Sequence, residues 1–438
     1  MVGMLAAMST APHPSSSQAT AVSRDGGDAC PGALRLHAAD DGALARVRIP
    51  GGVLTVRQAT SLGDAARRLG DGELHLTSRG NVQLRGLRPA CGAELAGLLE
   101  PAGLLPSPAH ERVRNVVASP LSGLDGHGVR DVRPWLTALD AALCASTAAV
   151  TLSGRFLFAL DDGRGDVAAL GADVTVRATA GGAALLTLGG AREALRVSGE
   201  DAPRAALLAA EVFLEISRAS GSGAWRVDEL PVPVAELTAA VERALTRAGV
   251  GCAPAARDTG EAEGPAPGPV GSALCVHAPF GRFTAGQWRE LTRAAAAFPP
   301  GELRLTPWRG VVVPAPDAEP DRAASVLARL AAAGLVTDAG SPWPRVGACT
   351  GRPGCATSRA DVRADAARAL TAVGRTPLPV YWSGCERRCG HPRGDHVDVV
   401  AAPGGGYRVT TAVRGRDPRG TLLDDPSGFA AALARTLP

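Results

Sequence analysis

The sequence predicts an internally duplicated α+β protein, and three observations support this prediction. Short motifs recur in the same order at offsets of 229 to 231 residues. The motif pairs are GELHLT (72–77) and GELRLT (301–306), Ala-Gly-Leu-Leu (102–105) and Ala-Gly-Leu-Val (333–336), Asp-Val-Arg (131–133 and 361–363), Ser-Gly (153–154 and 383–384) and Arg-Gly-Asp (164–166 and 393–395). Both copies show the same succession of strand and helix periodicities, and a segment rich in Pro, Gly, Ala and Glu at 254–272 separates them.

The repeats divide the 438 residues into an N-terminal extension and two copies joined by a linker. The Ser-, Ala- and Pro-rich extension at 1–28 is predicted to be disordered. Each copy begins with a small α+β half-domain and continues into a larger α/β domain. The half-domains are predicted at 29–106 and 273–338, the larger domains at 107–253 and 339–438, and the linker at 254–272.

Each half-domain is predicted to contain its strands and helices in the same order. The strands are Leu44–Ile49, the GELHLT motif and Val82–Leu84 in copy one, and Ala273–His277, the GELRLT motif and Val311–Val313 in copy two. The first helices open at Ser61-x-x-Asp64 and at Thr284-x-x-Gln287, both similar to a capping box. In the second of these helices one face holds Trp288, Leu291, Ala295 and Phe298, and each half-domain ends with a helix before its Ala-Gly-Leu motif.

Each larger domain is predicted to contain a helix at or near its Asp-Val-Arg motif. The helix of copy one is predicted at Val132–Ala145 and that of copy two at Arg359–Val373. The second helix opens at Ser358-x-x-Asp361 and stops before a glycine, which are typical start and stop signals. A strand at Pro379–Trp382 follows it.

The composition excludes several classes of function. All 46 basic residues are arginine, which excludes a Schiff-base lysine and the lysine of a phosphate-binding loop. The net charge of +3 gives no support for a surface that binds nucleic acid. No apolar stretch reaches the roughly 18 residues that a membrane span needs, and the N-terminus lacks the basic start of a signal peptide. We therefore expect a cytoplasmic protein with neither nucleic-acid nor membrane partners.

The nine cysteines are too sparse for a disulfide scaffold and fall into two groups. Five stand alone and are predicted to be small buried apolar residues, namely Cys30, Cys91, Cys144, Cys252 and Cys275. The other four form a C-x5-C pair and a C-x3-C pair, namely Cys349, Cys355, Cys385 and Cys389. Four thiolates can hold a 4Fe–4S cluster or a structural zinc. The wide spacings favour the cluster, and two structural disulfides are a third alternative.

The duplication offers an internal control for the clustered cysteines. Subtracting 230 from their numbers gives Ser119, Asp125, Arg155 and Ala159, so copy one is expected to lack a cluster. The same arithmetic places Arg155 opposite Cys385. One half is therefore predicted to hold a redox centre, and the other to offer guanidinium groups to an anion.

Three motifs and the two cysteine pairs resemble the nitrite/sulfite reductase superfamily. The motifs are TSRGNVQL (77–84), RNVVASPLSG (114–123) and LSGRFLFALDD (152–162), and the resemblance extends from about Ala29 to Asp398. It implies two ferredoxin-like half-domains and two larger α/β domains related by a pseudo-twofold axis. Together these domains are expected to hold a tetrapyrrole beside a 4Fe–4S cluster.

Two further segments narrow the resemblance within this superfamily. ACPGALRLHAADDGALARVRIPGG (29–52) and ACTGRPGC (348–355), together with the short chain, are most similar to the oxygen-dependent tetrapyrrole monooxygenases of aerobic cobalamin synthesis. This resemblance implies O2-dependent hydroxylation of precorrin-3A at C20 and closure of a γ-lactone with the ring-A acetate. A sirohaem-dependent nitrite or sulfite reductase is the alternative, and a non-catalytic Fe–S or zinc protein is a third hypothesis.

The resemblance implies roles for individual residues. Arg79 and Arg114 match two arginines that contact the macrocycle or its bound anion in the reductases, and Arg155 matches a basic residue of their active site. Leu157 stands where the sulfite reductases have a second lysine, which favours an apolar site for O2. Cys389 matches the cysteine that bridges the cluster to the sirohaem iron.

Four more residues are candidates for binding the tetrapyrrole, namely Arg85, Arg309, Asn81 and Asn115. Guanidinium forks suit the acetate and propionate arms of such a substrate, because they form bidentate hydrogen bonds with carboxylates. The two asparagines fit a turn or strand-end hydrogen bond equally well.

The expected cofactor is the 4Fe–4S cluster, with a non-haem iron as a further candidate and sirohaem less favoured. A mononuclear iron would need histidine and carboxylate ligands. The residues of those types near the motifs are His75, His391, Asp395 and His396, and the sequence assigns none of them to iron. No GxGxxG motif opens a helix after a strand, so electrons are expected from an external reductase or ferredoxin. The other expected partners are the small-molecule tetrapyrrole and O2.

Overall fold

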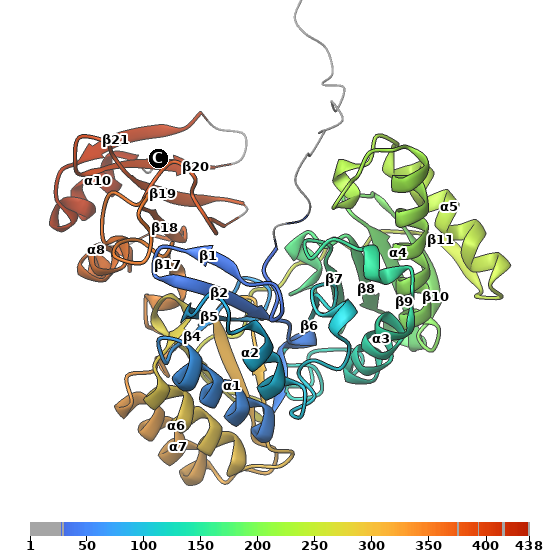
Figure 1. Cartoon of the computed structure of the whole chain (residues 1–438), viewed down its shortest axis with the longest axis horizontal. Helices are drawn as coiled ribbons and strands as arrows, with labels where there is room; N and C mark the ends of the chain where they lie inside the picture. Colours follow the sequence, from blue (N-terminus) through green and yellow to red (C-terminus); the bar gives the residue numbers. More distant parts are fainter. Residues whose placement is uncertain (1–27, 29, 375, 393, 414–416, 437–438) are drawn as a thin grey trace, which may run out of the picture.

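The computed structural model describes residues 28, 30–374, 376–392, 394–413 and 417–436. The extension predicted at 1–28 lies outside these residues except for Asp28, whose carboxylate accepts hydrogen bonds from the amides of Cys30 and Gly154. The described residues form four sheets. The two half-domains lie side by side, with larger domain one on their right and larger domain two at upper left (Figure 1).

The half-domain sheets exchange their edge strands. One sheet has the order β1-β2-β5-β4-β14 and the other the order β12-β13-β16-β15-β3. The strands of copy one are β1 (His37–Ala39), β2 (Gly42–Val47), β3 (Val53–Thr55), β4 (Leu74–Leu76) and β5 (Val82–Leu87). Those of copy two are β12 (Gly268–Val270), β13 (Ala273–His277), β14 (Arg282–Phe283), β15 (Glu302–Leu305) and β16 (Gly310–Pro314). Because each copy completes the sheet of the other, the two half-domains share one pseudo-twofold unit and one apolar core.

Four helices cover these two sheets on one side, namely α1 (Val56–Leu69), α2 (Gly92–Leu99), α6 (Ala285–Ala296) and α7 (Pro320–Ala332). The predicted capping box at Thr284 is confirmed. The predicted opening of α1 at Ser61 is wrong, because Thr55 and Gln58 form the capping box and the helix begins six residues earlier, where β3 ends. Helices α1 and α6 pack together, and the indole of Trp288 donates a 2.7 Å hydrogen bond to the carbonyl of Ala59.

The larger domains each have a sheet that starts parallel and ends antiparallel. Domain one contains β6 (Val116–Ala118), β7 (Phe158–Asp161), β8 (Val174–Ala178), β9 (Ala183–Leu188), β10 (Glu193–Ser198) and β11 (Cys252–Ala256), with α3 (Arg133–Ala145), α4 (Ala202–Ala219) and α5 (Val234–Arg247). Domain two contains β17 (Val346–Ala348), β18 (Val380–Ser383), β19 (His396–Ala401), β20 (Tyr407–Ala412) and β21 (Arg419–Leu423), with α8 (Val362–Arg368), α9 (Leu370–Val373) and α10 (Phe429–Thr436).

Two predicted boundaries are wrong. The segment 254–272 is not all linker, because Pro254 lies in β11 opposite Leu195 and Pro269 lies in β12 opposite Leu274. Both strands lie at sheet edges, where proline is tolerated. The helix predicted at 359–373 is two short helices, α8 and α9, and the side chain of Asp361 caps the first of them.

The structure also corrects the register of the repeat in the larger domains. Val116 pairs with Phe158 at the start of one parallel ladder, and Val346 pairs with Val380 at the start of the other. Copy one is therefore eight residues longer between its first two strands. The Ser-Gly and Arg-Gly-Asp motifs do not occupy equivalent positions in the two copies.

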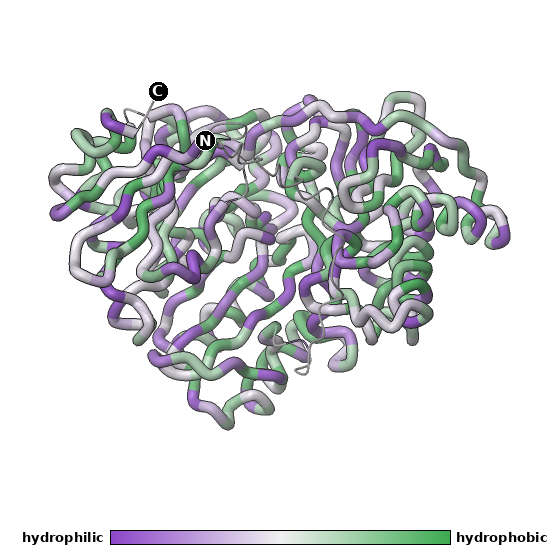
Figure 2. Tube along the Cα trace, turned by 90° about the horizontal axis from the view of Figure 1, so that it is seen from above, coloured by the Kyte–Doolittle hydropathy of each residue, from purple (hydrophilic) through white to green (hydrophobic). Residues whose placement is uncertain are grey.

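Hydrophobic and hydrophilic residues are interspersed along the described part of the chain (Figure 2). Among the described residues, no helix combines the length and apolar character needed to cross a membrane. Of the five lone cysteines, Cys91 and Cys275 are buried as predicted, whereas Cys30, Cys144 and Cys252 are only partly buried.

Candidate functional site

A cavity of about 510 Å³ opens where both half-domains meet both larger domains. Its lining comes from the β4–β5 loop (Ser78, Arg79), larger domain one (Leu157, Ala169, Leu170, Arg226), the β15–β16 loop (Pro307, Trp308, Arg309) and larger domain two (Pro344, Arg345, Val346, Gly347, Pro379, Val380, Tyr381, Gly390, His391, Pro392). We call this cavity the central cleft. Its volume is within the range of small-molecule sites, and it adjoins the loop that contains the last two clustered cysteines.

The two hairpin loops of the central cleft are structural equivalents. In each loop a threonine amide donates to the carbonyl four residues later, from Thr77 to Asn81 and from Thr306 to Gly310. The third residue after each threonine has a left-handed backbone, with φ of 66° at Gly80 and 64° at Arg309. Glycine adopts this conformation without strain, whereas an arginine there is strained, a feature that clusters at functional sites.

Four largely buried arginines form one cationic group at the central cleft. Arg79 and Arg226 line the cleft, and Arg46 and Arg48 are their charged neighbours. Burial lowers the pKa of Arg48 to about 9, and the like charge of Arg46 adds to this effect. Burial also lowers the pKa of Arg79 to about 10, with further contributions from Arg226 and Arg46. Like charges are held this closely only at a cost in free energy, which an anion in the cleft would relieve.

Two of these guanidinium groups have buried nitrogen atoms that bond to nothing among the described residues. They are Nε of Arg46 and one terminal nitrogen of Arg48. The other donors of Arg48 are fixed by the carbonyls of Arg112 and Gly154. Buried donors without partners are rare in folded proteins and indicate a missing acceptor. The carboxylates near this group are those of Asp28 and Asp173.

Three arginines of this group were not predicted from the sequence, namely Arg46, Arg48 and Arg226. The first two lie on or beside β2, two residues apart, so their side chains leave the chain on the same side. An Arg-x-Arg pattern in an otherwise apolar strand is a signal that could have identified them. Arg226 had no such signal, because it reaches the cleft from a loop and is held there by an ion pair with Asp173 at 2.6 Å.

One wall of the central cleft is apolar. Leu157 is buried and packs with Val117, Ala159, Val167 and Ala172, and Trp308 packs against the same cluster. The amide of Leu157 donates a 2.8 Å hydrogen bond to the carboxylate of Asp173, which fixes the backbone at this point. The wall is therefore rigid and without a charge at the leucine position.

Of the five arginines predicted to bind the tetrapyrrole, Arg79 and Arg309 line the central cleft. Arg114 instead forms a bidentate ion pair with Asp140 at 2.7 and 2.8 Å, which satisfies its guanidinium in the domain interior. Arg85 does the same with Asp41 at the edge of a second cavity. Arg155 is exposed, and its guanidinium lies over the ring of Trp225.

The two predicted asparagines bond to each other rather than line the cleft. The amide nitrogen of Asn81 donates to the side-chain oxygen of Asn115 at 3.1 Å. The oxygen of Asn81 accepts from the amide of Ile49, and the nitrogen of Asn115 donates to the carbonyl of Phe156. Both side chains thus join half-domain one to larger domain one.

The four clustered cysteines converge on one side of larger domain two. Cys349 follows β17 directly, and its sulfur accepts a 3.2 Å hydrogen bond from the amide of Gly384. Burial raises the pKa of the Cys389 thiol, as do the charges of Cys349, Cys385 and Cys355. The four groups therefore interact electrostatically, and a positive centre is needed to hold them all as thiolates.

The spacing of the four sulfur atoms discriminates between the candidate groups. No three of these described sulfurs lie within 4.8 Å of one another. A single zinc with bonds of about 2.3 Å would bring them to roughly 3.8 Å. All four are free of disulfides. This spacing is wider than that of the ligands of a single zinc ion.

Tyr381 connects this cysteine group to the central cleft. The guanidinium of Arg309 lies 5.8 Å from the centre of its ring. The packing is close, because a Cβ built on Gly347 would come within 2.5 Å of the ring and one on Gly390 within 2.9 Å of the hydroxyl. Tyr381 and the two glycines, which line the central cleft, are therefore packed against one another beside the cysteine loop.

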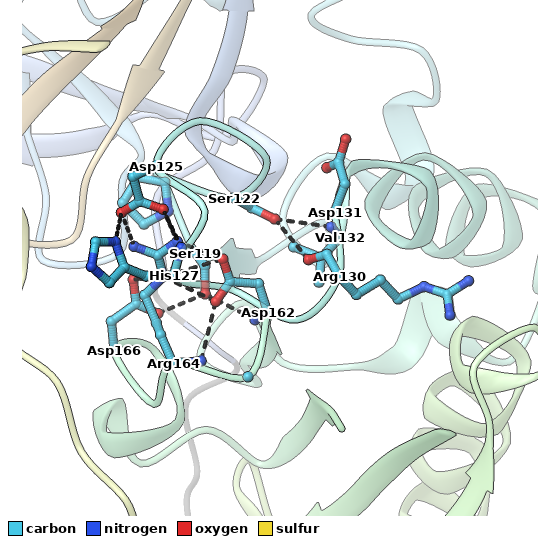
Figure 3. A network of polar contacts seen from close by, with 12 residues as sticks. Ser119, Ser122, Asp125, His127, Arg130, Asp131, Val132, Asp162, Arg164 and Asp166 are labelled. Atoms are coloured by element: carbon cyan, nitrogen blue, oxygen red, sulfur yellow. Dashed lines mark hydrogen bonds and ion pairs between the residues drawn. The ribbon is translucent and has the colours of Figure 1, made fainter. Parts of the chain in front are cut away.

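Larger domain one contains a polar network where larger domain two has its cysteines (Figure 3). Ser119 follows β6 as Cys349 follows β17, and its amide bonds the neighbouring strand in the same way. Its hydroxyl donates a 2.6 Å hydrogen bond to Asp166, while Arg164 pairs with both Asp125 and Asp162. Burial raises the pKa of Asp166 to about 7.

The predicted counterpart of Cys385 is wrong. With the corrected strand register, the position equivalent to Cys385 is Gly163, two residues after β7, and not Arg155. Simple subtraction failed because of the eight additional residues between β6 and β7.

The histidines considered for a non-haem iron lie in two separate places. His391 lines the central cleft, whereas His75 lines the second cavity with Asp71 and Glu73. The ring of His396 lies 5.9 Å from that of His391.

Comparisons with known proteins agree with this architecture. Residues 37–101 and 267–333 each match the model of the nitrite/sulfite reductase ferredoxin-like half domain. The NirA protein of Mycobacterium tuberculosis superposes with a TM-score of 0.68 at 19% identity, over 90% of this chain and 80% of that one. The predicted fold, a duplicated nitrite/sulfite reductase-like architecture, is confirmed.

Two curated relatives are similar over most of the chain. A precorrin-3B synthase of Sinorhizobium sp is 28% identical over 417 residues, which is 93% of this chain and 87% of that protein. A ferredoxin–nitrite reductase of Synechococcus elongatus is 28% identical over 401 residues, which is 82% of this chain and 76% of that protein.

Proposed function

We propose that this chain, in which two segments match the nitrite/sulfite reductase ferredoxin-like half domain, is an oxidoreductase acting on a tetrapyrrole. In particular, we propose the activity of a precorrin-3B synthase. One atom of O2 enters precorrin-3A at C20, and the ring-A acetate closes a γ-lactone. The second oxygen atom leaves as water, with two electrons from an external donor and two protons.

The observation that supports an oxygenase over a reductase is the position of Leu157. It lies in a wall of apolar side chains on the central cleft, at the place where the resembling sulfite reductases have a lysine. A buried lysine there would favour a small anionic substrate. An uncharged wall favours O2 and an uncharged reacting carbon instead.

The arginines of the cleft suit the carboxylate arms of precorrin-3A. Arg79, Arg226, Arg309 and Arg345 line the cleft itself. A charge-assisted hydrogen bond of a guanidinium with a carboxylate contributes about 1.5–3 kcal/mol. Because the arginines of the cationic group repel one another in the free protein, a polycarboxylate would gain further from relieving that repulsion.

The four clustered cysteines are proposed to hold a 4Fe–4S cluster, which would supply electrons one at a time. Tyr381 and Arg309 would keep the cysteine loop in register with the cleft. The electron donor is proposed to be an external ferredoxin or reductase. The relative from Synechococcus elongatus is named for a ferredoxin donor.

The direct test is single turnover with anaerobically purified protein, precorrin-3A, a chemical reductant and ¹⁸O-labelled O2. The expected product has gained one labelled oxygen atom, and mass spectrometry detects it. An absorption spectrum and metal analysis accompany the assay. If precorrin-3A remains unlabelled and unchanged, the oxygenase activity is contradicted. If the same protein contains four irons and four sulfides without a Soret band, the assignment of the 4Fe–4S cluster still stands.

A sirohaem-dependent nitrite or sulfite reductase is the second candidate. The unpartnered nitrogens of Arg46 and Arg48 favour it, since they could receive a small anion. The same purified protein would then show a Soret band with a long-wavelength sirohaem band, and would reduce nitrite or sulfite with reduced methyl viologen.

A further inference from the structure

The Asp-Val-Arg repeat places two arginines at equivalent points of the larger domains. Arg133 is the first residue of α3, and Arg363 is the second residue of α8. Each helix lies between the first two strands of its domain, so the 230-residue offset corresponds here to a true structural equivalence. The cysteines are present beside one arginine and absent beside the other.

In the domain without the cysteines, the arginine is neutralised by carboxylates. The guanidinium of Arg133 donates three hydrogen bonds to Asp131, at 2.6, 3.0 and 3.1 Å. Glu302 lies 3.8 Å away on its other side. These contacts raise the pKa of Arg133, as expected for a cation paired with anions.

In the domain with the cysteines, the equivalent arginine has no such partner. Among the described residues, no carboxylate oxygen lies within 4.0 Å of the guanidinium of Arg363. The carboxylate of Asp361 caps α8 instead, and Glu73 is paired with Arg282.

Within the described part of the chain, the Arg363 side chain donates a hydrogen bond to the cysteine loop. Its Nε donates to the carbonyl of Cys349 at 3.2 Å. Burial lowers the pKa of Arg363, and so do the like charges of Arg282 and Arg85. A largely buried cation is thus kept free of carboxylates beside the first cysteine.

We propose that Arg363 is a positioning residue that supplies the fixed counter-charge of the four-cysteine centre and raises its reduction potential. This inference rests on the proposed function, in which these cysteines hold a 4Fe–4S cluster. Reduction adds one electron to a centre that is already negative, so a nearby buried cation favours the reduced form. Carboxylates placed as they are around Arg133 would cancel the effect of the cation on the reduction potential. The absence of such carboxylates around Arg363 is therefore consistent with this role.

The side chain of Arg363 is reached by solvent through the second cavity. Its volume is about 660 Å³, and its lining includes Arg363, Arg282 and Thr350 of the first cysteine loop. Because water can enter there, salt will screen part of the interaction, and the effect of Arg363 will be larger at low ionic strength.

The test is a redox titration of the anaerobically purified protein, followed by electron paramagnetic resonance, with dithionite as the one-electron reductant. We expect Arg363→Gln to lower the reduction potential. The equilibrium constant for reduction should fall on the order of tenfold, which corresponds to about 59 mV for one electron. Arg363→Lys keeps the charge and should stay near the wild-type value. Arg133→Gln makes the same change in the other copy and should shift nothing.

The outcomes separate this inference from the proposed function. A wild-type protein without iron and sulfide would contradict the proposed cluster itself. A loaded cluster with the same potential in Arg363→Gln and wild type would overturn only the counter-charge. If Arg363→Gln fails to load iron, the iron content and the reduction potential of Arg363→Lys distinguish the role of the charge from that of the hydrogen bond. Loading with a wild-type potential supports the need for charge, and failure of both variants assigns the residue to the hydrogen bond with Cys349.

Discussion

The hydroxyl of Tyr381 donates a 2.7 Å hydrogen bond to the backbone carbonyl of Cys389, the last of the four clustered cysteines. Tyr381 lies in β18, and its ring is covered by the guanidinium of Arg309 from the other half of the cleft. The bond ties an exposed loop to a rigid strand. The cysteine that adjoins the central cleft is therefore held from the side of the cleft.

Removing this hydrogen bond should loosen the cysteine loop. Tyr381→Phe is expected to cost about 1 kcal/mol of local stability and to reduce iron and sulfide per chain after anaerobic purification. Tyr407→Phe is the matched control, because its hydroxyl bonds Asp365 and not the cysteine loop. Equal metal content in the two variants would contradict a role for Tyr381 in holding the loop.

A cation at the apolar wall should change the ligand preference of the cleft. Leu157→Lys is expected to lower O2-dependent hydroxylation of precorrin-3A at least tenfold, and to lower the melting temperature, because an ammonium group is buried among apolar side chains. It should also bind sulfite more tightly than wild type, which titration calorimetry measures. Leu157→Met conserves volume and should stay within a few-fold of wild type. Hydroxylation by Leu157→Lys at the wild-type rate would exclude Leu157 as the determinant.

Arg79 should contribute to substrate affinity, whereas Arg85 should not. Arg79→Gln is expected to weaken binding of precorrin-3A about tenfold, or about 1.4 kcal/mol, because one charge-assisted bond to a carboxylate is lost. Arg85→Gln removes a guanidinium that is already paired with Asp41 outside the central cleft. The dissociation constants follow from fluorescence titration. Equal losses in both variants would place the carboxylate arms elsewhere.

Asp166 should make the stability of the protein depend on pH. Burial raises its pKa from 3.8 to about 7 in the folded chain, so between these values the folded state binds the proton and the unfolded state does not. The contribution of Asp166 to the free energy of unfolding therefore falls as the pH rises from about 4 to 7, and does not change further above pH 7. Asp166→Asn should remove this part of the slope in urea unfolding at a series of pH values.

The control for this measurement is Asp64→Asn, since Asp64 is half exposed on α1 and pairs only with Arg67 nearby. It should leave the slope unchanged. The same slope in Asp166→Asn and wild type would show that the network shares its proton among other carboxylates of Figure 3.

Several features were available from the sequence alone. The duplication, the capping box of Thr284 and the two cysteine pairs depend on local spacing and on residue identity, which folding does not change. The buried face of α6 followed from the helical period, and Trp288 and Leu291 are buried as predicted.

Other features were decided only by tertiary structure. The sequence predicted that α1 opens at Ser61, whereas β3 pairs with β15 of the other copy and the helix begins directly after it, capped by Thr55. Likewise, nothing near Arg114 in sequence showed that Asp140 would neutralise it.

The candidate site shows the same division most clearly. The sequence by itself determined which residues could bind an anion or a cluster, because side-chain chemistry is fixed by residue type. Tertiary structure decided which of them face the cleft, since the charge that a guanidinium presents depends on its neighbours in space. Arg85 is paired by a carboxylate 44 residues away, whereas Arg46 and Arg48 come together with Arg79 and remain short of acceptors.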